Sequence, residues 1–237
     1  GKGSDNIHAG QSELLKELEL SHDQHLLIKA HCDAAGIGFL STAFDLDSLD
    51  YLRSIGISLF KIPSGEITNL PYLRRIASIA DTIILSTGMS SLEEVKAALD
   101  ILLSGSLTLD DVVILHCTTA YPTPLHEVNL LAMNSIKEAF GVRVGYSDHT
   151  DGIEVAIAAV GLGARVIEKH LTLDRLMLGP DHFASIEPSE FCQMVSGIRA
   201  IEQALGDGHK APTRSESENI ILARKSIVAS KKICKGE

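Results

Sequence analysis

"VGYSDHT" at residues 144–150 and "RVIEKHLT" at residues 165–172 share an unusual ending. Each begins as the apolar, β-branched run that is typical of a buried strand, but closes on a histidine, His149 in the first and His170 in the second. In a barrel, the carboxyl ends of successive parallel strands lie at one common face. The two stretches therefore predict two imidazoles that neighbouring strands deliver to one place.

The same pattern extends outward from these stretches. From about residue 37, six short apolar runs alternate with amphipathic segments of helical period. They are IGFLST (37–42), LFKIPS (59–64), TIILST (82–87), VVILHC (112–117), VRVGYS (142–147) and RVIEKH (165–170). The runs end 22 to 30 residues apart, which is the spacing of βα units. Because polar residues follow every run rather than one switch point, we predict a (β/α)8 TIM-type barrel with about six βα units present.

Helices are predicted between the runs and at both ends of the series. Glu13–Leu18 and His22–Ala34 precede the first run, and "SSLEEVKAALDILL" from Ser90 has a capping residue and acids in its first turn. A last helix is predicted over Pro188–Gly206. The following text, "DGHKAPTRSESEN", is polar and predicts a linker.

Composition limits the classes of protein to which the chain can belong. Its 237 residues, 45% of them hydrophobic, suffice for a full core in one domain. A formal net charge of −10 argues against a bulk attraction to nucleic acid or anionic membranes. The four cysteines form no C-x-x-C pair, which favours a reducing cytoplasm. No apolar segment reaches the ~18 residues of a membrane span, and no signal peptide is recognisable.

Strand alternation predicts which of these side chains face the barrel mouth. Ser147 and His149 share one side of their strand, and Glu168 and His170 share one side of the next, with Lys169 opposite. If both histidines face the mouth, they form a divalent-metal site with positions left for water or substrate. The alternative is that each is a hydrogen-bonded histidine of the core or rim.

Hydroxyl-bearing residues recur at the ends of the other runs. With Lys61 on the second run and glycines behind, they predict a site that binds phosphate by hydroxyls, amides and one cation. Taken singly, each is also an ordinary turn residue. The residues concerned are Ser41, Thr42, Ser64, Ser86, Thr87, Thr118, Thr119, Gly65 and Gly88.

Two further stretches carry polar candidates. "LGPDHFAS" places Asp181 and His182 just past the last run, either as site residues or as an Asx-type turn. Tyr121 in "YPTP" either contacts a polyol or covers the rim of the barrel.

Seven stretches resemble, in order and spacing, the N-acetylneuraminate (sialic acid) synthases. They are "FLSTAFD", "FKIPSGE", "ILSTGM", "LHCTTAYPTP", "VGYSDHT", "VIEKHLTLD" and "GPDH". The likeness covers nearly the whole chain from about Glu13. Its "GPDH" form is closer to the sialic and legionaminic branches than to the pseudaminic one. Thr119 stands where some members have Asn.

The resemblance implies a metal-dependent synthase. Such an enzyme condenses phosphoenolpyruvate with an N-acetylated sugar, N-acetylmannosamine or a legionaminic-type diacetamido sugar, to give a nonulosonic acid and phosphate. Carried over by motif, His149 and His170 would hold Mn²⁺ or Mg²⁺, Tyr121 and Asp181 would contact the sugar, and Glu66 would act as an acid or base. The residues around phosphoenolpyruvate would be Thr42, Lys61, Ser64, Ser86, Thr119 and Ser147.

The resemblance also sets expectations for the rest of the chain. The family's first two βα units have no counterpart before "IGFLST", and a C-terminal antifreeze-like (SAF) domain starts only at "SIVASKKICKGE". We therefore expect an N-terminally incomplete barrel at residues 1–206, a linker at 207–225 and the start of a truncated SAF domain at 226–237. The parent enzyme is expected to be a cytoplasmic homodimer.

Two other functions compete with this one. A Schiff-base aldolase on the same barrel would need a nucleophilic lysine, but Lys169 has the wrong parity and Lys61 lies in the hydroxyl cluster. A non-catalytic relative would serve polysaccharide or spore-coat biosynthesis. Against this alternative, the candidate metal and phosphate residues are all present.

Overall fold

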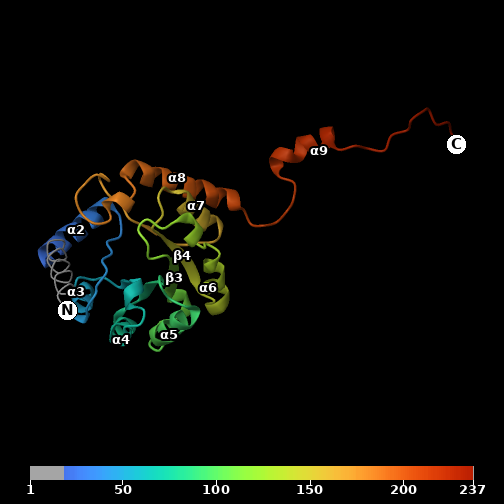
Figure 1. Cartoon of the computed structure of the whole chain (residues 1–237). Coiled ribbons are helices and arrows are strands. Elements are labelled where there is room, and N and C mark those ends of the chain that lie inside the picture. Colours follow the sequence, from blue (N-terminus) through green and yellow to red (C-terminus); the bar gives the residue numbers. More distant parts are fainter. Residues whose placement is uncertain (1–18, 237) are drawn as a thin grey trace.

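A parallel sheet forms the centre of the molecule (Figure 1). The structure is a computed structural model, and it describes residues 19–236. The five strands lie in the order in which they occur in the chain, so that each pairs with the one before it. They are β1 (Leu59–Ile62), β2 (Thr82–Ser86), β3 (Val112–Cys117), β4 (Arg143–Asp148) and β5 (Ile167–Lys169). This order is the one that successive right-handed βα units produce.

Helices surround the strands, and Figure 1 shows α2 to α8 arranged around them as half of a barrel. They are α2 (His22–Ala35), α3 (Leu46–Ser54), α4 (Leu70–Ile79), α5 (Leu92–Leu102), α6 (Ala132–Phe140), α7 (Glu154–Gly161) and α8 (Pro188–Leu205), with α9 (Ser217–Ala223) beyond them. Single 3₁₀ turns are η1 (Ser64–Glu66), η2 (Leu109–Asp111), η3 (Leu125–Glu127), η4 (His182–Ala184) and η5 (Arg214–Glu216).

Capping explains where several predicted helices begin. At α5 the Ser91 hydroxyl accepts from the Glu94 amide, and the Glu94 carboxylate accepts from the Ser91 amide, so a capping box closes the helix start. Pro188 occupies the first turn of α8, where its missing N–H removes no intrahelical bond. The predictions of helices over His22–Ala34, after Ser90 and over Pro188–Gly206 are confirmed. The helix predicted over Glu13–Leu18 lies outside the described residues.

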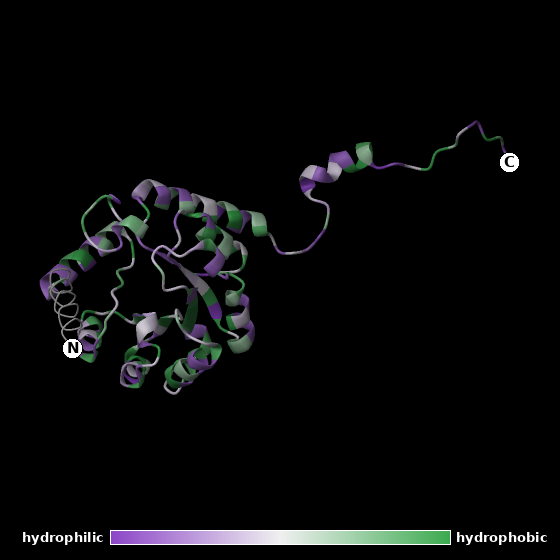
Figure 2. Cartoon of the chain, viewed as in Figure 1, coloured by the Kyte–Doolittle hydropathy of each residue, from purple (hydrophilic) through white to green (hydrophobic). Residues whose placement is uncertain are grey.

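The core lies between the strands and the helices. Phe60 and Ile62 of β1 are fully buried on the helix side, as are Ile83 and Leu85 of β2. Figure 2 shows β3 as an apolar strand, whereas hydrophilic and hydrophobic residues alternate along the surrounding helices. Burial on the helix side therefore leaves the alternate residues of each strand to line the interior of the half-barrel.

One predicted strand is wrong. Residues 37–42 form no strand, and the described residues 19–236 form five strands where the sequence predicts six. The stretch lies beside the open side of the sheet, and Ile37 and Leu40 are 61% and 42% exposed. An apolar run becomes a strand only when a ladder and packing on its faces fix it, and neither is complete here. The five strands form half of a parallel α/β barrel, and the eightfold count stays a prediction.

The part of the chain after α8 packs little. No residue of η5 or α9 is buried, and Figure 1 shows the chain running away from the half-barrel after α8. The boundaries predicted at 206 and 225 stay predictions. Among residues 19–236, no helix is long and apolar enough to cross a membrane.

Candidate functional site

The carboxyl ends of β4 and β5 bring the two predicted imidazoles together. The ring centroids of His149 and His170 lie 5.4 Å apart, with the rings nearly perpendicular at 79°. His149 follows the last residue of β4, and His170 follows the last residue of β5. The prediction that neighbouring strands deliver both imidazoles to one place is confirmed.

Hydrogen bonding settles which nitrogen of His149 is available. Its Nδ1 lies 2.8 Å from the carbonyl oxygen of Thr118. Because a carbonyl can only accept, the proton resides on Nδ1, and Nε2 keeps its lone pair. Burial lowers the pKa of His149, and the nearby His170 lowers it further against the opposing hydrogen bond to Thr118. The neutral tautomer with an available Nε2 is the form in which histidine binds a metal.

A charged cluster lies next to this pair inside the half-barrel. Lys61 is buried, and its Nζ lies 3.3 Å from Oε2 of Glu168. The Ser147 hydroxyl donates to Oε1 of Glu168 at 2.7 Å and lies 3.5 Å from Nε2 of His149. Lys61, Ser147, Glu168 and the imidazoles therefore form one continuous polar group, as strand alternation predicts.

Hydroxyls gather beside this cluster at the ends of β1 and β2. The Ser64 hydroxyl accepts from the Gly88 amide at 2.9 Å and lies 3.4 Å from Sγ of Cys117. A Cβ on Gly88 would lie 2.4 Å from Oγ1 of Thr119, so the β2 and β3 loops approach each other closely here. The Ser86 hydroxyl is buried and has no hydrogen-bond partner among residues 19–236. An orphaned buried hydroxyl marks a site where a ligand oxygen would complete the hydrogen bonding.

The predicted sugar contacts lie over the imidazoles. The Tyr121 ring lies 4.2 Å from that of His149 and 5.6 Å from that of His170, between ring centroids. Asp181 adopts a left-handed backbone at φ 63°, and its Oδ2 lies 3.8 Å from Nδ1 of His170. Burial raises the pKa of Tyr121, which therefore stays a neutral hydroxyl at neutral pH.

The opposite faces of β4 and β5 carry a separate ion pair. Lys169 Nζ contacts Oδ2 of Asp148 at 2.9 Å, and both side chains are almost completely buried. The predicted parity of Lys169, away from Glu168 and His170, is therefore confirmed. Lys169 lies on the helix side of the sheet, away from the interior where the imidazoles lie, so it is not placed to act as a Schiff-base nucleophile there.

Two predicted residues are not joined to the cluster. Oε2 of Glu66 accepts from the Asn69 side chain at 2.6 Å, at the start of α4. Thr42 is half-buried in the loop before α3, and within residues 19–236 no hydrogen bond connects it to Lys61 or Ser64. Their assigned roles stay predictions.

Sequence reasoning placed Glu168 on the side of His170 and counted Thr118 among the hydroxyl-bearing residues, but it did not predict the contacts by which each holds another site residue. Glu168 bridges Lys61 and Ser147, and the Thr118 carbonyl orients His149. Glu168 was recoverable, because its parity matches that of His170 and the parallel register pairs it with Ser147. The bond between His149 and Thr118 uses a backbone carbonyl oxygen, so the type of residue at position 118 does not predict it.

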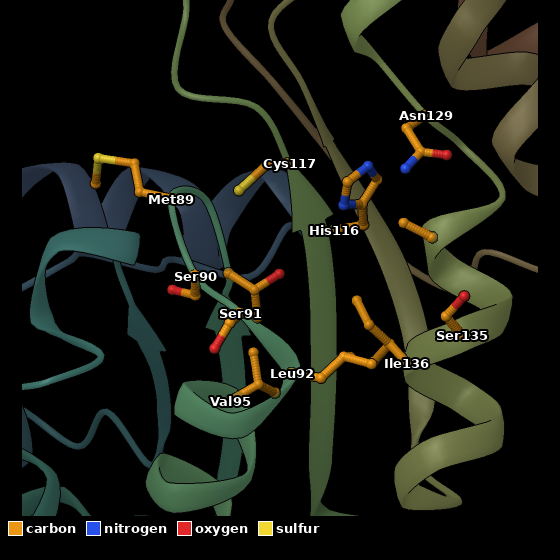
Figure 3. A pocket seen from close by; sticks show the side chains of 12 residues that line it. Met89, Ser90, Ser91, Leu92, Val95, His116, Cys117, Asn129, Ser135 and Ile136 are labelled. Atoms are coloured by element: carbon orange, nitrogen blue, oxygen red, sulfur yellow. The ribbon is translucent and has the colours of Figure 1, made fainter.

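A second hollow lies on the helix side of the sheet. It is a cavity of about 390 Å³ between α5 and α6, and Figure 3 shows His116 of β3 facing it from the strand. Nε2 of His116 already contacts the Val128 carbonyl oxygen at 2.7 Å. Cys117 also lines this cavity, whereas neither His149 nor His170 does.

The donor set fits a divalent ion with open coordination positions. Within residues 19–236, no group of three or more His, Cys, Asp and Glu side chains is arranged to hold a metal. Imidazole nitrogens suit Zn²⁺ and similar ions, and a bound Mn²⁺ would take its oxygen ligands from water or substrate. Structural zinc sites use four protein ligands and catalytic ones three, so a pair of donors would leave most of the coordination to water or substrate.

Comparison with known proteins places the chain in a family. The sequence model of the NeuB family matches residues 2–210. The chain belongs to the NeuB family. It is 52% identical over 227 residues to the N,N'-diacetyllegionaminic acid synthase of Campylobacter jejuni, covering 96% of this chain and 68% of that one. The synthase of the same name from Legionella pneumophila is 47% identical, with 95% of this chain and 64% of that one covered.

A solved structure agrees with the fold. The N-acetylneuraminic acid synthetase of Leptospira borgpetersenii, in complex with citrate, superposes with a TM-score of 0.82 at 33% identity, covering 94% of this chain and 75% of that one. The NeuB-family chain thus shares its half-barrel with a sialic acid synthetase, and its relatives are synthases of nonulosonic acids. It spans 68% and 64% of the lengths of the two relatives.

Proposed function

We propose that this chain carries the condensing site of a nonulosonic acid synthase that joins phosphoenolpyruvate to an N-acetylated amino sugar and releases phosphate. The observation that carries the proposal is the imidazole pair beside the buried Lys61, Glu168 and Ser147. A cation, hydroxyl donors and two metal-binding nitrogens are the groups that a phosphorylated enol and a sugar aldehyde need at one place. The wider assignment includes a cytoplasmic homodimer.

The reaction is a carbon–carbon condensation followed by phosphate loss. C3 of phosphoenolpyruvate forms a bond to the aldehyde carbon of the open-chain sugar, and a water oxygen adds at C2. The C2–O bond to phosphate then breaks, which leaves a 2-keto acid. A divalent ion held by His149 and His170 supplies Lewis-acid polarisation of the aldehyde oxygen.

The residues of the chain divide the remaining work. Lys61 places its ammonium group against the phosphate, and the Ser64 and Ser86 hydroxyls donate to phosphate oxygens. Ser86 is suited to this because its buried hydroxyl otherwise has no partner in the described part of the chain. Tyr121 and Asp181 face the sugar above the imidazoles. Glu66 stays a candidate acid or base, with Thr42, Thr119 and Ser147 around the enol phosphate.

The favoured sugar is the diacetamido precursor of a legionaminic-type acid. Two relatives named N,N'-diacetyllegionaminic acid synthase, at 52% and 47% identity, support this choice over N-acetylmannosamine. The direct test incubates the protein with phosphoenolpyruvate, Mn²⁺ and each sugar, and follows inorganic phosphate together with the keto acid product. We expect phosphate release only when a sugar is present, and most with the diacetamido sugar.

Two controls separate the competing functions. Borohydride with pyruvate would trap a covalent adduct on a Schiff-base aldolase, and we expect none because Lys169 lies on the helix side of the sheet, away from the imidazoles. A non-catalytic relative would bind no phosphoenolpyruvate and release no phosphate with any sugar. Either result contradicts the synthase proposal.

Removal of one imidazole gives the first residue-level prediction. We expect His149→Ala or His170→Ala to weaken Mn²⁺ binding at least ~10-fold, because each deletes one of two protein donors. The measurement is the free Mn²⁺ signal in an electron paramagnetic resonance titration, with His116→Ala as the control histidine on the helix side of β3. Unchanged affinity in both site variants would remove the metal assignment.

A further inference from the structure

The two residues that precede the imidazoles form a buried charged network on the other face of the sheet. Lys169 Nζ donates to Oδ2 of Asp148 at 2.9 Å and to the Thr150 carbonyl oxygen at 2.7 Å. The amide and the hydroxyl of Thr150 both donate to Oδ1 of Asp148, at 2.9 and 2.8 Å. The side chains of Lys169 and Asp148 are 1% and 0% exposed. Every partner in this network is therefore satisfied away from water.

Stability alone does not account for such a network. Replacing a buried ion pair by apolar residues of similar volume is often neutral or stabilising, because two charges must be stripped of water to form it. A buried pair instead restricts the geometry of the segments that carry it. Its place in the fold therefore indicates what it does.

The network begins where the backbone ladder ends. Asp148 and Lys169 are the last register pair between β4 and β5, so no further ladder pair ties the next residues of these two strands to each other. Those next residues are His149 and His170. Their carbonyl oxygens accept instead from two other segments, at the amides of Thr123 and Ile186. The β5 strand is only three residues long, which makes the ladder alone a weak constraint on its end.

Both sides of His149 are held by the same side chains. Asp148 precedes His149 and Thr150 follows it, and the Asp148 carboxylate binds the Thr150 amide and hydroxyl. Lys169, which precedes His170, reaches across to both Asp148 and Thr150. The segments that carry the two imidazoles are thus tied by three side chains, none of which contacts an imidazole ring.

We propose that Asp148, Thr150 and Lys169 are positioning residues that set the separation and orientation of the His149 and His170 rings. We name the three the β4–β5 brace. The inference rests on the proposed function where it says that the rings hold a divalent ion. The geometric statement concerns the metal-free protein and is tested separately.

The test removes both charges while it keeps side-chain shape. Asp148→Asn retains an oxygen that accepts from Thr150, and Lys169→Met retains the length of the lysine stem, so the double variant carries no unpaired buried charge. Ile76→Ala in α4 is the control, because Ile76 is fully buried and its loss destabilises the protein away from β4 and β5. All three proteins are compared at matched fractions folded.

Two measurements are made on the full chain. The first is the nuclear Overhauser contact between the His149 and His170 rings in the metal-free protein, where the centroids lie 5.4 Å apart. We expect this contact to be lost in the double variant and kept in Ile76→Ala. The second is Mn²⁺ affinity, which we expect to fall about 10-fold in the double variant, as for other residues that orient metal ligands, and to stay unchanged in the control.

Each outcome decides something. A folded double variant that keeps the ring contact overturns the inference, whatever its Mn²⁺ affinity. If the wild-type protein shows the ring contact but binds no Mn²⁺, the metal proposal is contradicted. The ring contact in the double variant then still tests the β4–β5 brace. If the double variant does not fold, Thr150→Val replaces it, since this change deletes one hydroxyl bond and keeps both charges. We expect about threefold weaker Mn²⁺ binding and a weakened ring contact in that variant, and an intact ring contact there overturns the inference.

Discussion

Neighbouring residues at the ends of β4 and β5 have opposite surroundings. His149 keeps Nε2 available because its Nδ1–H donates to the Thr118 carbonyl oxygen, whereas Asp148 directly before it is buried on the helix side. On β5, Lys169 is likewise buried on the helix side, whereas His170, the next residue, lies beside His149. A single-residue shift along either strand would exchange the two environments, so we infer that register matters here more than residue type.

Lys61 gives a prediction at the residue scale. We expect Lys61→Met to weaken phosphoenolpyruvate binding ~10-fold or more, because a charge-assisted contact typically contributes about 1.5–3 kcal/mol. The measurement is the Kd from isothermal titration. The control is Lys96→Met, since Lys96 is an exposed lysine of α5 paired with Asp100. Equal binding by both variants would place the phosphate away from Lys61.

At the scale of the elements, β4 depends on having no side chain at Gly145. A Cβ there would lie 2.4 Å from the Val166 carbonyl oxygen and 2.5 Å from Cδ2 of Leu115. The carbonyl belongs to the backbone and accepts from the Tyr146 amide at 2.9 Å, so it cannot move aside without loss of that bond. Close contact of β4 with its neighbours therefore requires glycine at this position.

Gly145→Ala should consequently lower the free energy of unfolding by about 1–3 kcal/mol, the range for overpacking a filled core. The measurement is urea denaturation followed by circular dichroism. An unchanged dependence of the free energy of unfolding on urea concentration shows that the variant differs in stability alone. Gly38→Ala is the matched control, because a Cβ on Gly38 would meet nothing within 4 Å. Equal midpoints for the two variants would show that β4 and β5 can move apart freely.

Periodicity predicts five of the strands and three of the described helices, because both depend on local patterns of apolar residues and caps. It fails at residues 37–42, where the apolar run lacks a complete ladder. Parity likewise places Ser147, His149 and His170 on the interior. It cannot find the orphaned Ser86 hydroxyl or the Thr118 carbonyl bond, because both depend on distances between segments far apart in the chain.

At the scale of the whole molecule, two buried tyrosines make the stability of the fold depend on pH. Tyr72 and Tyr146 are fully buried, and the Tyr72 hydroxyl donates to the Ala43 carbonyl oxygen at 2.7 Å. Burial raises the pKa of both phenols well above the ordinary value. In the unfolded chain each ionises from about pH 10, so above that pH the folded state binds more protons and stability falls as pH rises.

We therefore expect the free energy of unfolding, measured by urea denaturation, to fall steeply above pH ~10, by up to about 1.4 kcal/mol per pH unit for each of the two groups. The measurement pairs tyrosinate absorbance with circular dichroism. Two of the four tyrosines should ionise only as the fold is lost. In Tyr72→Phe, the free energy of unfolding should fall less steeply as the pH rises. Reversible ionisation of all four tyrosines near pH 10 in the native protein would contradict the prediction.

The order of the strands also bears on how the polypeptide acquires its shape during synthesis. Each strand pairs with the one made just before it, so every new βα unit closes a short loop onto an edge that already exists. Short closures cost little entropy, and the N-terminal strands leave the ribosome before the C-terminal ones. The imidazole site needs both β4 and β5, so a nascent chain can form it only after both of these strands have left the ribosome.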